Sequence, residues 1–202
     1  MQLYYSPGAC SLAPHIVLHE LGLPFQAVKA DTKTKQTPDG TDYWTINNKG
    51  QVPALRLDSG DVLTEGPVIS QYLADQKPES KLAPAAGTMQ RYRLQEWLNF
   101  ITSEMHKGIG GLFNPKLTDD MKVIMRGNMD RHLNWLEKKL AGGGEFLMGG
   151  FTIADAYLFT VLNWTKFVGI DLSKWPAIQA YQGRVEARPA VQATLKAEGL
   201  IK

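Results

Sequence analysis

The sequence contains a single cysteine, Cys10, among its 202 residues. An internal disulfide needs two cysteines and a cysteine-rich metal site needs several, so both are excluded within this chain. A lone thiol fits a reducing compartment. We therefore expect a cytoplasmic protein, with export to the periplasm left open as the alternative.

Long apolar runs and an excess of one charge are also lacking. No apolar stretch approaches the ~20 residues that a membrane helix needs, and the first residues lack the charged start and apolar core of a signal peptide. Lys and Arg number 22 against 20 Asp and Glu, which gives a net charge of +2 without a basic stripe. Neither a membrane nor a nucleic acid is the expected partner.

Several well-known site motifs are missing. The sequence has no G-x-S-x-G elbow, no G-x-x-x-x-G-K-[ST] phosphate loop and no dinucleotide fingerprint after its first strand-like segment. His15 and His19 have the spacing of a metal-binding pair on a helix, but no Glu or third ligand accompanies them. We therefore expect no metal site.

The first part of the chain, residues 1–78, alternates short strand-like runs with helical ones. This order, βαβ followed by ββα, predicts a layered α/β domain. The expected elements are a strand at 2–5, a helix at 11–22, a strand at 25–30, a polar segment with one short helix, a hairpin of 52–57 and 61–65, and a helix at 66–76.

Residues 79–86 are rich in proline and small residues, which is typical of a linker. Residues 87–202 predict an all-helical domain. Its expected helices lie within 88–108, 117–144, 151–169, 175–188 and 189–199. Thr152 and Asp155 have the spacing of a capping box and predict a fixed helix start.

Cys10 lies where the first predicted strand meets the first predicted helix. Free backbone N–H groups and the positive end of the helix dipole favour a thiolate at such a junction. The commoner interpretation of a lone cysteine is a small buried hydrophobe. Both interpretations stay open from the residues alone.

Two further fragments resemble parts of a peptide-binding site. A cis bond before Pro53 would turn the backbone of Val52 outward toward an extended ligand, although a proline here also marks an ordinary strand start. Glu65 and the N–H of Gly66 precede a helix and suit the amine and carboxylate of an α-amino acid. A Glu at this place also commonly complements only the helix dipole.

The helix that contains His106 has two contrasting faces. Its apolar stripe predicts core positions at Leu94, Trp97, Leu98, Ile101 and Met105. The opposite face bears short hydrogen-bonding groups and predicts the lining of a cleft at Tyr92, Asn99, Ser103 and His106. A single helical histidine is nevertheless more often a surface group or a satisfied core group.

Taken together, "YYSPGACSLAPHIVL", "KGQVPAL", "LTEG", "EWLNFITSEMHKG", "FTIADAYLF" and the "RPAVQ...EGLIK" tail resemble the cytosolic glutathione transferase family. The resemblance is to its bacterial beta class and covers essentially the whole chain. It implies a thioredoxin-like N-terminal domain that binds glutathione and a helical C-terminal domain that supplies a hydrophobic acceptor site. It also implies a homodimer.

The resemblance assigns roles in the first domain. Cys10 would face the glutathione sulfur, with Tyr5 and Ser11 near the places where other classes keep a thiol-activating hydroxyl. The remaining glutathione contacts would be Val52 with the cis-proline Pro53, Glu65 and Gly66 at the γ-glutamyl end, and Lys35 at the glycine carboxylate.

In the helical domain the resemblance implies glutathione contacts from Asn99, Ser103 and His106, the last also catalytic. Glu104 would reach a neighbouring subunit's ligand, and Phe113 and Trp164 would shape the acceptor site. The sequence departs from the family where Gly66 replaces a frequent serine, where "INNKGQ" replaces "NPKGQ", and in the glycine-rich "HKGIGGLFNP". These departures leave the substrate preference open.

The implied activity is conjugation of the glutathione thiolate to hydrophobic electrophiles, as in detoxification. Thiol–disulfide exchange through a mixed disulfide of Cys10 and glutathione is compatible with it. The alternatives are a specialised glutathione-dependent isomerase or reductive dehalogenase, and a non-enzymatic binding protein on the same fold. A specialised enzyme would have almost no activity with a generic chloronitrobenzene. A non-enzymatic member of the fold would usually lack several of Cys10, Glu65, Ser103 and His106.

Overall fold

The computed structural model describes all residues, 1–202, and its contacts divide the chain into two compact units. Unit 1 comprises Met1–Ala83 together with Arg188–Lys202, and unit 2 comprises Pro84–Ala187. The boundary lies inside the predicted linker. The sequence predicts the C-terminal segment as part of the helical domain, but its contacts group it with unit 1, because α8 (Pro189–Ala197) packs against α1 (Leu12–Leu21).

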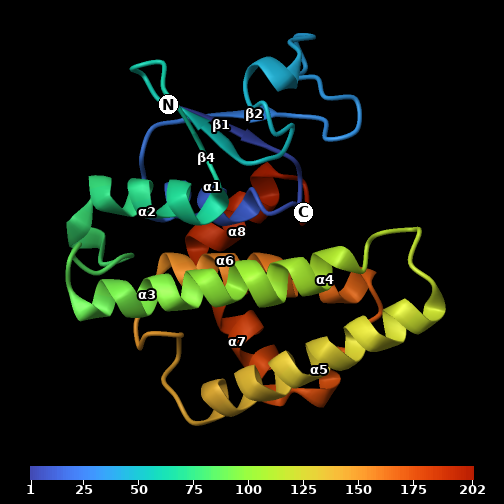
Figure 1. Cartoon of the computed structure of the whole chain (residues 1–202). Coiled ribbons are helices and arrows are strands. Elements are labelled where there is room, and N and C mark those ends of the chain that lie inside the picture. Colours follow the sequence, from blue (N-terminus) through green and yellow to red (C-terminus); the bar gives the residue numbers. More distant parts are fainter. The chain divides into compact units, whose positions relative to one another are not determined.

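Unit 1 has the predicted order of strands and helices (Figure 1). Its elements before α8 are β1 (Gln2–Tyr5), α1, β2 (Gln26–Lys29), the 3-10 turn η1 (Tyr43–Thr45), β3 (Ala54–Arg56), β4 (Val62–Thr64), α2 (Gly66–Gln76) and the 3-10 turn η2 (Pro78–Ser80). The sheet order is β2-β1-β3-β4, with β1 and β2 parallel and the other pairs antiparallel. The predicted α/β fold class is confirmed.

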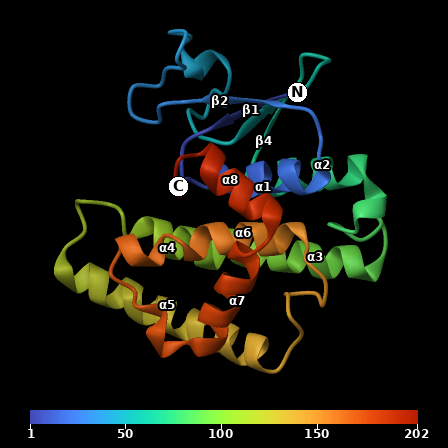
Figure 2. The ribbon, with the colours of Figure 1, turned by 180° about the vertical axis from the view of Figure 1, so that it is seen from behind.

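The alternation of side chains along β1 divides the core of unit 1 into two layers. Leu3 is fully buried, whereas Tyr4 belongs to a second cluster with Tyr43 and Val52. Figures 1 and 2 show α1, α2 and α8 together on one side of the sheet. The second cluster joins the sheet to the segment at 31–50, so that this irregular segment has its own core.

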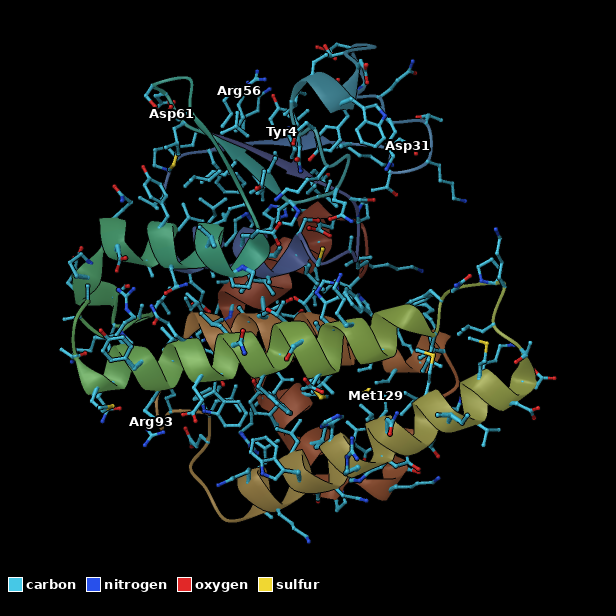
Figure 3. All side chains as sticks on the ribbon, viewed as in Figure 1. Tyr4, Asp31, Arg56, Asp61, Arg93 and Met129 are labelled. Atoms are coloured by element: carbon cyan, nitrogen blue, oxygen red, sulfur yellow. The ribbon has the colours of Figure 1, made fainter.

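Tyr43 anchors that segment from η1. Its hydroxyl donates to the carbonyl of Gln51 at 2.9 Å, and burial raises the pKa of Tyr43 to about 12. On the sheet nearby, the guanidinium of Arg56 lies 5.5 Å from the ring centre of Tyr4 (Figure 3). The backbone at Gln51 is therefore hydrogen-bonded to a fully buried aromatic residue.

All the regular elements of unit 2 are helices or helical turns. Its elements are α3 (Met89–Phe100), the π-helical turn η3 (Ile101–His106), α4 (Lys107–Gly111), α5 (Asp119–Ala141), α6 (Ile153–Leu162), the 3-10 turns η4 (Thr165–Phe167) and η5 (Leu172–Lys174), and α7 (Pro176–Glu186). All residues of α6 are buried, and the predicted capping box of Thr152 and Asp155 begins it. None of the helices in the chain is long and apolar enough to cross a bilayer.

The sequence predicts one regular helix through residues 88–108, but the structure inserts the π-helical turn η3 into it. The apolar stripe is confirmed as core at Leu94, Leu98, Ile101 and Met105, while Trp97 is half-buried in an aromatic cluster with Phe100 and Trp135. A π-helical turn widens the helix locally, and such turns are frequent at functional sites.

Close packing follows at α4. A β-carbon added at Gly108 would lie 2.2 Å from the sulfur of Met129 on α5, so a side chain there would require Met129 to move. Figure 3 labels Met129 on its helix. The glycine-rich stretch noted in the sequence is thus explained at this position by the approach of α5.

Candidate active site

Cys10 lies in the turn between β1 and α1, directly before the N-cap residue Ser11. The predicted strand-to-helix junction is confirmed. The side chain is half-buried, and its thiol donates a hydrogen bond to the carbonyl oxygen of Val52 at 3.1 Å. The sulfur therefore lies beside the backbone that precedes Pro53, and Cys10 is not sealed in the interior.

Hydrogen bonds within the turn fix the backbone around Cys10. The Ser11 hydroxyl donates to the carbonyl of Ser6 at 3.2 Å and accepts from the N–H of Ser6 at 3.1 Å. Ser11 is fully buried, so these bonds engage it in the turn itself. The role of the Ser11 hydroxyl in activating the glutathione thiol stays a prediction.

Tyr5 ends β1 and is half-buried. Burial raises the pKa of Tyr5, and the charge of Glu198 raises it further. The phenol is therefore a proton donor throughout the neutral pH range.

The Val52–Pro53 peptide bond, left open by the sequence, is cis. Gly66, the first residue of α2, lies next to Pro53, because a β-carbon added at position 66 would be 3.8 Å from the proline Cγ. The start of α2 therefore lies next to the Val52–Pro53 backbone in unit 1.

Glu65 precedes α2 in a left-handed conformation, with φ 69° and ψ 112°. A non-glycine residue rarely adopts such a conformation, and its cost is typically accepted at functional sites. The carboxylate is largely exposed and forms an ion pair with the ammonium of Lys49, which also donates to the Thr64 hydroxyl at 2.8 Å. Glu65 thus has a cationic neighbour, Lys49, to which the sequence assigned no role.

Lys35 also has a left-handed backbone, with φ 58°. Its ammonium donates to the carbonyl of Gly50 at 2.6 Å and lies 5.5 Å from the ring centre of Trp44. Gly50 has φ 61°, and a β-carbon there would lie 2.6 Å from the Trp44 ring. The Trp44 ring therefore packs directly against Gly50 and lies beside the Lys35 ammonium.

His15 and His19, the rejected metal pair, belong to a structural network in unit 1. The imidazole Nδ1 of His15 lies 2.8 Å from a carboxylate oxygen of Glu198, and Nδ1 of His19 lies 3.1 Å from the hydroxyl of Thr194. Glu198 also accepts from the N–H of Gly8, two residues before Cys10. No group of three His, Cys, Asp or Glu residues in the chain is placed to hold a metal ion.

His106 is the half-buried last residue of the π-helical turn in unit 2. Its Nδ1 lies 2.6 Å from the hydroxyl of Tyr157 on α6. The Trp164 ring meets the imidazole edge to face at 4.8 Å, and Phe113 meets Trp164 in the same manner at 6.4 Å. Unit 2 therefore brings together three residues predicted for chemistry and acceptor binding, His106, Phe113 and Trp164.

The other predicted residues of unit 2 lie elsewhere on the same helical run. Asn99 is exposed, and the hydroxyl of the exposed Ser103 donates to Glu104 at 2.9 Å. Glu104 lies 3.3 Å from the Nε2 of His132 on α5. Ser103 and Glu104 line a hollow of about 190 Å³ against α5, whereas His106 belongs to the aromatic group at Tyr157.

Comparison with protein families matches both halves of the chain. Residues 8–76 match the model of the glutathione S-transferase N-terminal domain, and residues 89–184 match that of the C-terminal domain. The chain belongs to the glutathione S-transferase family. It is a glutathione transferase enzyme, with the predicted α/β and helical domains of that fold.

Individual relatives of this transferase agree. Glutathione S-transferase GstA of Escherichia coli O157:H7 is 45% identical over 200 residues, covering 99% of this chain and 100% of that protein. A solved sphingomonad glutathione S-transferase, complexed with glutathione, is 50% identical with a TM-score of 0.95 over 100% of both chains. The beta-class enzyme of Sphingomonas chungbukensis is 49% identical with a TM-score of 0.95, again over 100% of both. The predicted resemblance to the bacterial beta class is confirmed.

Proposed function

We propose that this transferase binds glutathione in unit 1 and conjugates its thiolate to hydrophobic electrophiles. We also propose that it exchanges thiols and disulfides through a mixed disulfide of Cys10 and glutathione. The observation that carries the proposal is the contact of the Cys10 thiol with the Val52 carbonyl. A peptide thiol that pairs with this backbone has its sulfur near that of Cys10.

The α2 start supports binding of the γ-glutamyl end. Glutathione carries an α-amino acid group there, with one ammonium and one carboxylate. The Glu65 carboxylate suits the ammonium, and the N–H of Gly66 at the helix start suits the carboxylate. The left-handed conformation of Glu65 and its ion pair with Lys49 favour a positioned carboxylate over a mere dipole partner.

Further contacts are proposed from the family resemblance. We propose that Lys35 binds the glycine carboxylate of glutathione, with its ammonium leaving the Gly50 carbonyl to which it now donates. We also propose thiol activation by the hydroxyls of Tyr5 and Ser11. Glutathione contacts are proposed for Asn99 and Ser103, and a contact with a neighbouring subunit's ligand for Glu104.

In conjugation the glutathione thiolate attacks an electrophilic carbon, forms a carbon–sulfur bond and expels the leaving group with its electron pair. The enzyme must favour the thiolate over the thiol at neutral pH. Each unit by which the thiol pKa falls corresponds to about 1.4 kcal/mol, so a few directed hydrogen bonds suffice. His106 is the proposed proton donor or acceptor, and Phe113 with Trp164 forms the proposed apolar acceptor wall.

In exchange the Cys10 thiolate attacks the glutathione sulfur of a mixed disulfide between glutathione and a second thiol. The second thiol leaves as thiolate, and Cys10 becomes disulfide-linked to glutathione. A further glutathione thiolate attacks this bond, which releases glutathione disulfide and regenerates the Cys10 thiolate. Two electrons thus pass from glutathione to the original disulfide.

The variant Cys10→Ala separates the two activities. We expect it to lose reduction of mixed disulfides while conjugation of chlorodinitrobenzene persists. A Cys10→Ala variant that retained both activities would show that Cys10 takes no part in the chemistry. Very low activity of the wild-type enzyme with this acceptor would instead favour a specialised isomerase or dehalogenase. Thermal unfolding of both proteins controls for folding.

On the family resemblance we also propose that the protein is a homodimer, that it is cytoplasmic and that it acts in detoxification. The mass in solution, measured by light scattering, tests the first of these. Twice the 22.4 kDa of the chain is expected. A mass of one chain at micromolar concentration would contradict it.

A further inference from the structure

The imidazole of His106 is held by two aromatic residues of unit 2. The hydroxyl of Tyr157 lies 2.6 Å from Nδ1, and the two rings meet at 79°. Trp164 meets the imidazole edge to face at 73°. Tyr157 is 3% exposed, whereas His106 is half-buried. A buried phenol thus meets one nitrogen of a ring that solvent also reaches.

The direction of this hydrogen bond follows from the chemistry of the two groups. A phenol, with a pKa near 10, is a stronger donor than the N–H of a neutral imidazole. An imidazole nitrogen without a proton is a stronger acceptor than a phenol oxygen. The favoured arrangement has Tyr157 donating to Nδ1, which leaves the proton of the neutral ring on Nε2.

We propose that Tyr157 is a positioning residue for His106. Its hydroxyl fixes the tautomer and the orientation of the imidazole, so that Nε2 carries the proton for the reaction. This inference rests on the proposed role of His106 in the function above. Tyr157 acts through His106 and is not itself a catalytic residue.

The location of Tyr157 supports this role. It lies on α6, all of whose residues are buried, and the capping box at Thr152 and Asp155 fixes the start of that helix. His106 instead ends a π-helical turn, where the helix is locally wider. A rigid helix therefore supplies the hydrogen bond that orients a side chain on a locally widened one.

The variant Tyr157→Phe removes only the hydroxyl, because phenylalanine fills the same space. The first readout is the nitrogen-15 NMR spectrum of the His106 ring at a pH where it is neutral, with assignment by the variant His106→Asn. We expect the wild-type ring to be a single tautomer with a proton on Nε2 and a hydrogen-bonded Nδ1. In Tyr157→Phe the Nδ1 signal should move toward that of an unbonded nitrogen, and a fraction of the other tautomer should appear. An unchanged ring spectrum would overturn the proposal.

The second readout is kinetic. We expect kcat for conjugation to fall about threefold to tenfold in Tyr157→Phe, the range given by loss of one hydrogen bond, with little change in the KM for glutathione. In a His106→Asn background the same substitution should have no further effect. An equal loss in both backgrounds would show that Tyr157 acts through packing alone and would contradict the proposal.

A matched control is Tyr181→Phe, which removes another buried hydroxyl of unit 2, one that donates to Asp155 at 3.0 Å. It should lower the unfolding temperature but leave the His106 spectrum and kcat unchanged. A similar change in both variants would point to general loosening of unit 2 and overturn the specific role. Full activity of His106→Asn would overturn the proposed role of His106, and this inference with it, whatever the Tyr157→Phe spectrum.

Discussion

Glu198, four residues before the last residue of the sequence, meets the imidazole Nδ1 of His15 on α1 at 2.8 Å. Both side chains are buried, and the same carboxylate accepts from the N–H of Gly8 at 2.8 Å. One side chain therefore ties the C-terminal segment to α1 and to the turn that carries Cys10.

We expect Glu198→Gln to destabilise the protein by about 1 to 3 kcal/mol, because hydrogen bonds to a buried charge are lost or weakened. The unfolding temperature should fall by about 2 to 4 °C for each kcal/mol. The exposed Glu79 on η2 offers a matched control, since Glu79→Gln removes the same charge without a buried partner. Equal unfolding temperatures for the two variants would contradict a structural role of Glu198.

His19 is expected to make the stability of unit 1 depend on pH. Burial lowers the pKa of His19, and the nearby His15 lowers it further, while Glu198 and the Ala190 backbone oppose this. Since the pKa in the folded protein is below that in the unfolded chain, the stabilisation is complete above about pH 6.5 and is lost as pH falls through the lowered value. We expect the unfolding temperature of the wild type, relative to that of His19→Gln, to decline between about pH 7.5 and about pH 5, the range in which histidine side chains ordinarily titrate. A constant difference across these pH values would refute this.

Asp155 holds the start of α6 with more bonds than a simple cap. It accepts hydrogen bonds from the backbone and hydroxyl of Thr152, from the N–H of Leu147 and from the hydroxyl of Tyr181. We expect Thr152→Ala to cost about 1 kcal/mol, as the loss of a cap does, and Asp155→Ala about 3 kcal/mol or more, because it leaves several buried donors unpaired. Urea unfolding of both variants measures this. The reverse order would show that the cap, and not the wider network, stabilises the helix.

Gly66 offers a test of the binding role of the α2 start. A β-carbon at this position meets only Pro53, at an ordinary contact distance of 3.8 Å, so a serine should fit. Its hydroxyl would add a donor where the γ-glutamyl carboxylate is proposed to bind. We expect Gly66→Ser to lower the Kd for glutathione about threefold to tenfold and Gly66→Ala to leave it unchanged, as measured by calorimetry. The same affinity in both variants would place that carboxylate elsewhere.

The regular elements of both units could be predicted because their apolar residues repeat with clear periods. The strand at 2–5 and the helix at 66–76 have the expected bounds. The π-helical turn at Ile101–His106 escaped prediction because its apolar residues still fit a regular helix. The grouping of α8 with unit 1 also escaped, since a local pattern shows that a helix has an apolar face but not what that face packs against.

Candidate site residues could be proposed from the sequence where their chemistry is local, and not where it depends on residues distant in the chain. Cys10 and Glu65 stood out because each lies at a helix start. The partners Lys49 and Tyr157 did not, since Lys49 resembles any surface lysine and Tyr157 is separated from His106 by 51 residues. The cis state of the Val52–Pro53 bond was equally open, because the local sequence permits both isomers.

The most direct test of the proposed chemistry is the intact mass of the protein after incubation with glutathione disulfide. We expect the wild type to gain the mass of one glutathione, at Cys10, and to lose it again on addition of reduced glutathione, while Cys10→Ala keeps its original mass. An unchanged wild-type mass under these conditions would contradict the mixed disulfide and, with it, the reacting role of Cys10.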